Sequence, residues 1–279
     1  MTFSRTTAIA VALSSTAFAL PALAQDTFQG PYVAVFAGGA NTHDKSDDRL
    51  IFDTNGDGLF QETVVPAPGA DAFAPGFCEG TARGATPEIG CKKDKRRFDY
   101  GIRAGWDGRP GDGQFLAGML IEYQRGSARD ATSAFSTTPA SYVITRKFKD
   151  AVNFRGRLGY VLNDTALLYA TGGASYARIK NSFMTTNTVN SFTEFDDGDR
   201  VWGWQGGAGA EFALTPAISL GVEYLYSTYD LDDYEVRVGP GTATSTNPFL
   251  AVDPTGTTIR PSNKDFNVHA IRATASYHF

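Results

Sequence analysis

The chain has 279 residues and a formal net charge of −5, with 42% hydrophobic and 13% aromatic residues. After the first two dozen residues, no stretch holds the roughly 18 consecutive apolar residues of a membrane-spanning helix, and the aromatic content argues against disorder. Two cysteines and three histidines are too few for a usual zinc site, and an acidic chain of this kind is a poor nucleic-acid binder.

Residues 1–24 have the pattern of a cleaved secretory signal. Arg5 precedes an uncharged stretch over residues 6–20, and the small-residue sequence Ala22-Leu23-Ala24 follows it. The apolar stretch is shorter than a membrane anchor needs. We therefore expect residues 25–279 to be exported as one domain, into a compartment where a disulfide is chemically allowed.

The exported part alternates with period 2 and lacks long helical periodicity, which predicts an all-β fold. We expect eight strands of about 9 to 14 residues, long enough to cross a bilayer when tilted. The faces of the first and fifth strands stay unassigned, because each carries adjacent apolar residues. In chain order the strands are 30–40, 98–107, 115–124, 152–160, 166–179, 201–214, 218–228 and 271–279.

The connections between the expected strands alternate in length. Short turns lie at 109–113, 163–165 and 215–217, whereas long connections run about 42–97, 127–149, 180–199 and 230–263. With eight antiparallel strands, all long connections fall at one end and all tight turns at the other.

The two faces of the strands decide which side meets lipid. The apolar face holds large rings such as Trp202, Trp204 and Phe212, which a narrow eight-stranded lumen could not accommodate together. We expect these rings outside, and the opposite polar face inside. Unpaired charges in so dry a lumen would cost several kcal/mol each, so a paired network is expected. Its members are Arg103, Glu122, Arg155, Arg157, Glu211, Glu223 and Arg272.

Four stretches carry a resemblance to a known family. They are GPYVAVFAGGA, NFRGRLGYVLNDTALLYATGGASYA, VWGWQGGAGAEFALTPAISLGVEYLY and ATASYHF. The chain resembles the small eight-stranded outer-membrane β-barrels of Gram-negative bacteria, the porin-family surface proteins related in architecture to the OmpA barrel. The resemblance implies an antiparallel transmembrane barrel with long extracellular loops, short periplasmic turns and an outer-membrane location. The first long loop exceeds what a minimal member would need.

The final strand of the chain alternates Tyr277 and Phe279 with polar residues. By resemblance, these two aromatic residues form the signal that the barrel-assembly machinery reads.

The first long loop holds two candidate sites. Asp53, Asn55 and Asp57 match the first half of a calcium loop, but Val64 stands where the closing glutamate should be. A weak Ca²⁺ site and a metal-free loop of Asx turns are the two interpretations. Cys78 and Cys91 are expected to form a disulfide worth about 3 kcal/mol in the chain-entropy model, the alternative being two free thiols.

A basic run directly precedes the second expected strand, near the outer headgroups. It could hold the phosphates of lipopolysaccharide through charge-assisted hydrogen bonds, or be a solvated rim mixed with acidic residues. Its residues are Lys92, Lys93, Lys95, Arg96 and Arg97.

An enzyme is not expected. His269 has no serine two positions away, because residue 271 is Ile; His278 lies at the opposite strand end, and His43 lies in a loop. No cofactor is expected beyond weak Ca²⁺. The favoured function is a structural, surface-exposed envelope protein that contacts outer-membrane lipid and binds any surface ligand through its long loops. The alternative is a narrow passive pore for small solutes or ions.

Overall fold

The computed structural model describes residues 27–42, 48–198, 200–231 and 234–279. The expected signal peptide, residues 1–24, lies outside the described residues. Within the described parts of the chain, no helix is long and apolar enough to cross a membrane.

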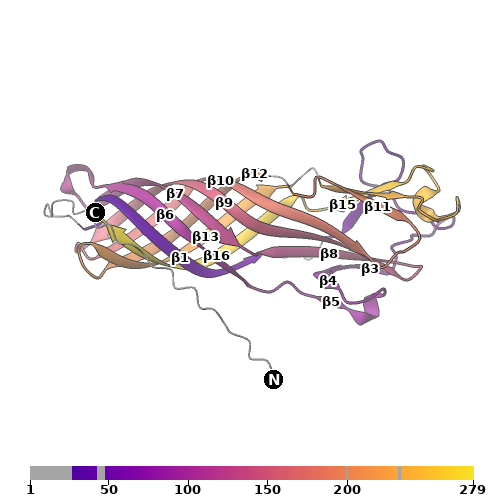
Figure 1. Cartoon of the computed structure of the whole chain (residues 1–279), viewed down its shortest axis with the longest axis horizontal. Coiled ribbons are helices and arrows are strands. Elements are labelled where there is room, and N and C mark those ends of the chain that lie inside the picture. Colours follow the sequence, from indigo (N-terminus) through magenta and orange to yellow (C-terminus); the bar gives the residue numbers. More distant parts are fainter. Residues whose placement is uncertain (1–26, 43–47, 199, 232–233) are drawn as a thin grey trace, which may run out of the picture.

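The described residues form a closed antiparallel barrel of eight strands, which occupies one end of the elongated molecule in Figure 1. Around the barrel, β1 pairs with β6 and β16, and the β9–β10 pairing completes the closure. The predicted all-β barrel is therefore confirmed. Its strands are β1 (Gly30–Thr42), β6 (Arg97–Gly108), β7 (Phe115–Gly126), β9 (Ala140–Leu162), β10 (Ala166–Thr185), β12 (Arg200–Ala213), β13 (Ile218–Asp230) and β16 (Asp265–His278).

The two faces of the barrel wall are oriented as the alternation predicted. Trp106 and Trp204 are 61% and 70% exposed on the outer wall, whereas Glu122 and Arg272 are each 1% exposed inside. Such an arrangement suits a wall whose outer face meets lipid and whose inner face is polar. The structure also orients the two strands whose faces the sequence left open. Tyr32 and Phe36 of β1 point inward, as does Tyr169 of β10.

Tight turns join the strands at the end of the barrel opposite the long connections. The β9–β10 turn places Asn163 and Asp164 at φ of 48° and 52°, in the left-handed region that asparagine and aspartate tolerate best. A short 3-10 helix, η2 (Pro110–Asp112), makes the β6–β7 turn. The predicted division into short and long connections is confirmed.

The long connections are not plain loops, contrary to the strand boundaries predicted from the sequence. β9 begins at Ala140 rather than near 152, and β10 runs on to Thr185, so both strands extend beyond the barrel. Further elements gather around this extension, which we call the outer cap. They are β2 (Leu50–Asp53), β3 (Gly76–Glu79), β4 (Thr81–Ala82), η1 (Pro87–Ile89), β5 (Cys91–Lys92), β8 (Arg129–Ser136), β11 (Ser191–Phe195), β14 (Glu235–Gly239), η3 (Pro248–Leu250) and β15 (Thr257–Pro261).

The outer cap has its own hydrophobic core. A four-stranded sheet in the order β11-β14-β15-β2 packs against the extended β8 and β9. The Phe73 ring lies 4.4 Å from Phe52, 5.3 Å from Tyr142 and 6.0 Å from Phe249, measured between ring centroids. Burying these rings stabilises an ordered cap, since each fully buried large apolar side chain contributes about 1.5–3 kcal/mol.

A disulfide joins Cys78 of β3 to Cys91 of β5, with the two Cα atoms 6.4 Å apart. The expected pairing is therefore present. It ties together the ends of a segment that holds only β4, β5 and the single turn η1 as regular structure. This segment has little core of its own, so the covalent link is a substantial constraint on it.

We predict that the double variant Cys78→Ser, Cys91→Ser keeps its barrel but exposes residues 79–90 to protease. The reason is local, because the link joins β3 and β5 of the cap, and neither is a strand of the barrel. Limited proteolysis followed by mass analysis would measure the effect, with the heat-induced gel-mobility shift reporting the intact barrel. Two alkylated thiols in unreduced wild-type protein would contradict the disulfide.

Candidate functional site in the lumen and at the outer rim

The lumen holds a dense cluster of ion pairs centred on Glu122 of β7. Its carboxylate accepts hydrogen bonds from Arg103, Arg155 and Arg272, at nitrogen–oxygen distances of 2.8, 2.6 and 3.0 Å. Glu223 of β13 lies 2.7 Å from Arg103, 3.3 Å from Arg155 and 3.6 Å from Arg272. Five of the seven predicted lumen residues therefore form one cluster, drawn from five strands.

Strand register brings these charges together. Arg103 lies directly opposite Glu122 across the β6–β7 pair, and Glu223 lies directly opposite Arg272 across the β13–β16 pair. Opposite charges at facing positions stabilise an antiparallel pair. If one of these strands shifted by one residue against its neighbour, its charged side chain would face lipid. The ion pairs therefore stabilise this register, and only this register brings the charges together.

The other two predicted residues form a second cluster nearer the tight turns. Arg157 of β9 lies 3.1 Å from Glu211 of β12 and 3.1 Å from Asp107 of β6. Glu211 also lies 3.3 Å from the Nε2 atom of His278, and it accepts a hydrogen bond from Ser219. The structure thus places all seven predicted residues in ion pairs, but in two clusters rather than one.

Three members of these clusters are missing from the predicted set. Asp99 accepts a 2.6 Å hydrogen bond from Arg272, Asp107 pairs with Arg157, and His278 contacts Glu211. The signal for them exists in the alternation, because each shares the polar face of its strand with a predicted member. Asp99 and Asp107 lie near the two ends of β6, and His278 is the last residue of β16.

Inward aromatic rings fill the space beside the arginines. The guanidinium carbon of Arg272 lies 4.5 Å from the centroid of the Phe36 ring, and that of Arg103 lies 5.7 Å from it. Gly101 makes room for this ring, since a Cβ there would lie 2.5 Å from Phe36. Contacts between cations and aromatic faces contribute about 0.5–2 kcal/mol each, more when desolvated.

Apolar layers close the lumen on both sides of the charges. Toward the tight turns, Phe28 is fully buried against Leu116, Val161 and Leu167. Toward the outer cap, a second layer includes Phe148, Ile179 and Phe266. The lumen is thus a stack of an apolar layer, two charged clusters and another apolar layer, and the larger apolar core of the cap lies above it.

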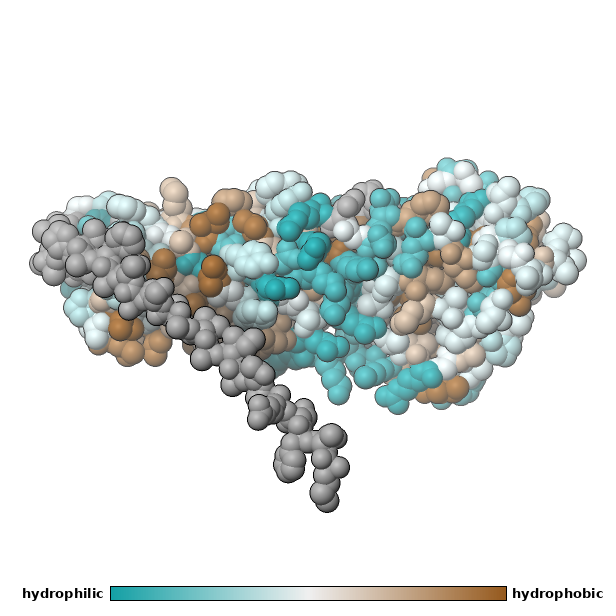
Figure 2. Space-filling model, in the orientation of Figure 1, coloured by the Kyte–Doolittle hydropathy of each residue, from teal (hydrophilic) through white to brown (hydrophobic). Residues whose placement is uncertain are grey.

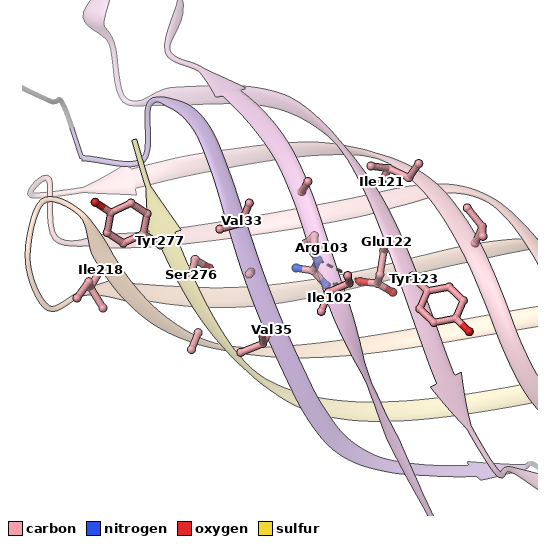
Figure 3. A pocket seen from close by; sticks show the side chains of 14 residues that line it. Val33, Val35, Ile102, Arg103, Ile121, Glu122, Tyr123, Ile218, Ser276 and Tyr277 are labelled. Carbon is pink, nitrogen blue, oxygen red and sulfur yellow. Dashed lines mark hydrogen bonds and ion pairs between the residues drawn. The ribbon is translucent and has the colours of Figure 1, made fainter. Parts of the chain in front are cut away.

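Figure 3 shows the barrel wall from the side of β1, β6, β7 and β16. An apolar groove of about 760 Å³ runs over the wall between outward side chains such as Val33, Val35 and Ile102. Arg103 and Glu122 point toward one another on the lumen side, joined by their ion pair. The wall therefore separates an apolar outer face from an inner face that carries buried charges, within a single strand layer.

The candidate calcium residues lie in an Asx-rich turn at the end of β2. The Asp53 carboxylate accepts hydrogen bonds from the backbone N–H groups of Gly56 at 2.7 Å and Gly58 at 2.9 Å. Asp57 accepts from the N–H of Leu59 at 2.8 Å, and Asn55 from that of Asp57 at 2.9 Å. Among the described residues, no three His, Cys, Asp or Glu side chains gather in an arrangement that could hold a metal ion. Weak Ca²⁺ binding stays a prediction.

The predicted basic run extends from Lys92, the last residue of β5, to Arg97, the first residue of β6, and all five of its side chains are exposed. Figure 2 shows hydrophilic residues gathered in a band across the middle of the molecule, where the barrel meets the outer cap. At the other end, Tyr277 and Phe279 are 48% and 46% exposed, with ring centroids 5.0 Å apart. Their role as an assembly signal stays a prediction.

We predict that Glu122→Gln destabilises the folded barrel by about 3–5 kcal/mol, because three buried arginines lose their shared carboxylate. Urea unfolding of the protein in lipid vesicles would measure this loss. Glu88→Gln, an exposed position in η1, removes the same charge and should have little effect. Equal stability of wild type and Glu122→Gln would contradict the importance of the cluster.

The chain is similar in sequence to outer-membrane proteins of Brucella. The chain is 30% identical over 130 residues to the 31 kDa outer-membrane immunogenic protein of Brucella melitensis, covering 47% of this chain and 53% of that one. It is 36% identical over 112 residues to the 25 kDa outer-membrane immunogenic protein of Brucella ovis, covering 37% and 51%. The chain thus spans about half the length of the curated relatives it matches.

Solved barrels match at low identity. OprG of Pseudomonas aeruginosa shares 13% identity with a TM-score of 0.47, over 91% of this chain and 99% of that one. Neisserial surface protein A shares 12% identity with a TM-score of 0.39, over 90% and 98%. Residues 10–279 match the model of the outer membrane protein beta-barrel domain family. The chain therefore belongs to this family and is an integral β-barrel of the Gram-negative outer membrane.

Proposed function

We propose that this protein is a non-conducting barrel that anchors the outer cap in the outer membrane and displays it at the cell surface. The closed lumen carries this proposal. In a water-filled pore, the lumen side chains would be accessible to water, yet Glu122, Glu223 and Arg157 are at most 1% exposed. Ions would have to displace two charged clusters and two apolar layers, which favours the structural function over the narrow pore.

The same geometry supports a non-enzymatic function. His278 lies beside a serine and an acid, which resembles the composition of a catalytic triad. However, Ser219 and Glu211 both contact the Nε2 atom, at 3.0 and 3.3 Å, whereas a triad places the acid on the opposite ring nitrogen. All three side chains are at most 2% exposed, and the Phe28 ring contacts that of His278. His269 contacts Tyr224 on the outer wall instead, and His43 lies outside the described residues.

We predict that the purified barrel in planar bilayers gives no stable single-channel steps. Phe28→Ala should also give no conductance steps, because weakening one apolar layer leaves both charged clusters and the other apolar layer in place. A known porin in the same bilayers serves as the positive control. Regular conductance steps from wild-type protein would overturn the proposal in favour of the pore.

A second proposed function is contact with lipopolysaccharide through the exposed run of Lys92, Lys93, Lys95, Arg96 and Arg97. Its position directly above the first residues of β6 supports this proposal, since Phe98 already belongs to the apolar outer wall. Cations at this level can form charge-assisted hydrogen bonds with lipid phosphates.

We predict that reversing the charge of Lys92, Lys93 and Lys95 to Glu lowers the lipopolysaccharide that co-purifies with the barrel by about half or more, because like charges then face the lipid phosphates. Quantifying bound lipid by its fatty acids would measure this. Arg49→Glu, Arg83→Glu, Arg125→Glu reverses the same number of exposed cations outside the run and is the control for charge alone. Unchanged lipid content in the lysine variant would count against the contact.

The outer cap is the part of the chain that a surface ligand would meet, and its ordered sheet gives such a ligand a fixed surface rather than mobile loops. Binding sites commonly lie on segments of this kind that a rigid scaffold positions.

A further inference from the structure

A basic groove lies on the outer side of β9 and β10, where the two strands leave the barrel. It encloses a cavity of about 270 Å³ and is separate from the lumen. Five cationic side chains line it, with hydroxyl groups between them. The cations are Arg97, Arg129, Lys147, Lys149 and Lys180.

Register places like charges face to face in this groove. Lys147 and Lys180 are direct partners across the β9–β10 pair. Like charges at facing positions destabilise an antiparallel pair, so the arrangement is unfavourable without an anion between them. A β-bulge next to this pair adds Lys149: Asp150 pairs with Arg178 and Phe148 with Ile179, which leaves Lys149 as the extra residue. Bulges redirect a side chain and are common beside functional sites.

The three lysines have no acidic partner within the described parts of the chain. Asp150, the nearest carboxylate in sequence, is engaged by Arg178 at 2.8 Å and Arg200 at 3.0 Å. Asp94 lies 3.7 Å from Arg129, so one of the five cations is compensated in part. The groove therefore holds excess positive charge.

The surroundings of Lys149 in the groove lower the pKa of its ammonium group. Lys149 lies outside the membrane-spanning part of β9, and its pKa is lowered by partial burial and by the neighbouring charges of Lys147, Lys180 and Arg178. Donors between the cations come from hydroxyl side chains that line the same groove, among them Thr145 and Ser182. Together these groups offer charge and hydrogen bonds to one small anion.

The groove lies at the level of the outer headgroups. Lipid-facing residues of β9 begin near Phe154, which is 48% exposed on the outer wall, and Lys149 precedes it by five residues in the same strand. Figure 2 shows the hydrophilic band at this junction. A ligand there can reach the groove from the membrane surface or from outside solution.

We propose that this groove binds a phosphate group, with Lys147, Lys149 and Lys180 as its ligands. The facing lysines and the bulged lysine converge on one cavity, and a multiply charged phosphate would relieve their repulsion. The phosphates of lipopolysaccharide and soluble phosphorylated molecules share this chemistry. The inference rests on the proposed function only in placing the groove at the membrane surface.

Calorimetry with inorganic pyrophosphate, on the full barrel in neutral detergent, tests the site. We expect wild type to bind and Lys147→Gln, Lys149→Gln, Lys180→Gln to bind at least about tenfold more weakly, the effect of one lost charge-assisted hydrogen bond. Arg49→Gln, Arg83→Gln, Arg125→Gln removes the same charge from exposed positions that do not line the groove, and should bind like wild type. The heat-induced gel-mobility shift confirms that each variant folds.

Absence of pyrophosphate binding by wild type would overturn the proposal. Equal weakening in both triple variants would also overturn it, because a diffuse surface field would then explain the binding. Lipopolysaccharide co-purification with the groove variant identifies the source. If the groove variant co-purifies with less lipopolysaccharide than wild type, the site binds lipid phosphate. If the amount of lipopolysaccharide is unchanged while pyrophosphate binding is weakened, the site binds a soluble phosphate. Arg97 belongs to both the groove and the basic run, but the lysine variant leaves it and the lumen unchanged, so the proposals on the run and on conductance can fail separately.

Discussion

The burial of Glu122 among three arginines is the interaction on which the rest of the structure depends. An eight-stranded barrel has a narrow lumen, and charges inside it are tolerated only when each has a partner at hydrogen-bond distance. Arg103 and Arg272 reach Glu122 only in the observed register. That register in turn sends Trp106, Trp204 and the other outer rings toward lipid. Lumen pairing and lipid exposure are thus two results of one alignment of strands.

The charge balance differs between the two lumen clusters. Around Glu122, three arginines meet three carboxylates when Asp99 is included. Around Arg157, one arginine meets the carboxylates of Asp107 and Glu211, and His278 is the third group beside them. The cluster near the tight turns thus has fewer arginines than carboxylates, and Glu211 accepts a hydrogen bond from the hydroxyl group of Ser219 in addition to its ion pairs.

The alternation of apolar and polar residues predicted the barrel and the charged residues that face the lumen. It could do so because each face of a strand such as β6 meets one environment along its length. It could not predict the outer cap, where a strand such as β14 alternates without large aromatics and within only five residues. Nor could it orient β1, because Tyr32 and Phe36 are aromatic yet point inward beside glycines of a neighbouring strand. The facing of Lys147 and Lys180 depends on a bulge, which no local pattern indicates.

The long β9–β10 ladder has a mechanical consequence. These strands stay paired from the turn at Asn163 to the pair of Thr185 with Tyr142 in the outer cap. A force that pulls on the cap along the barrel axis would load this ladder lengthwise, so that many hydrogen bonds share the load instead of opening one after another. The cap would therefore resist detachment under tension better than a cap joined to the barrel by unpaired loops.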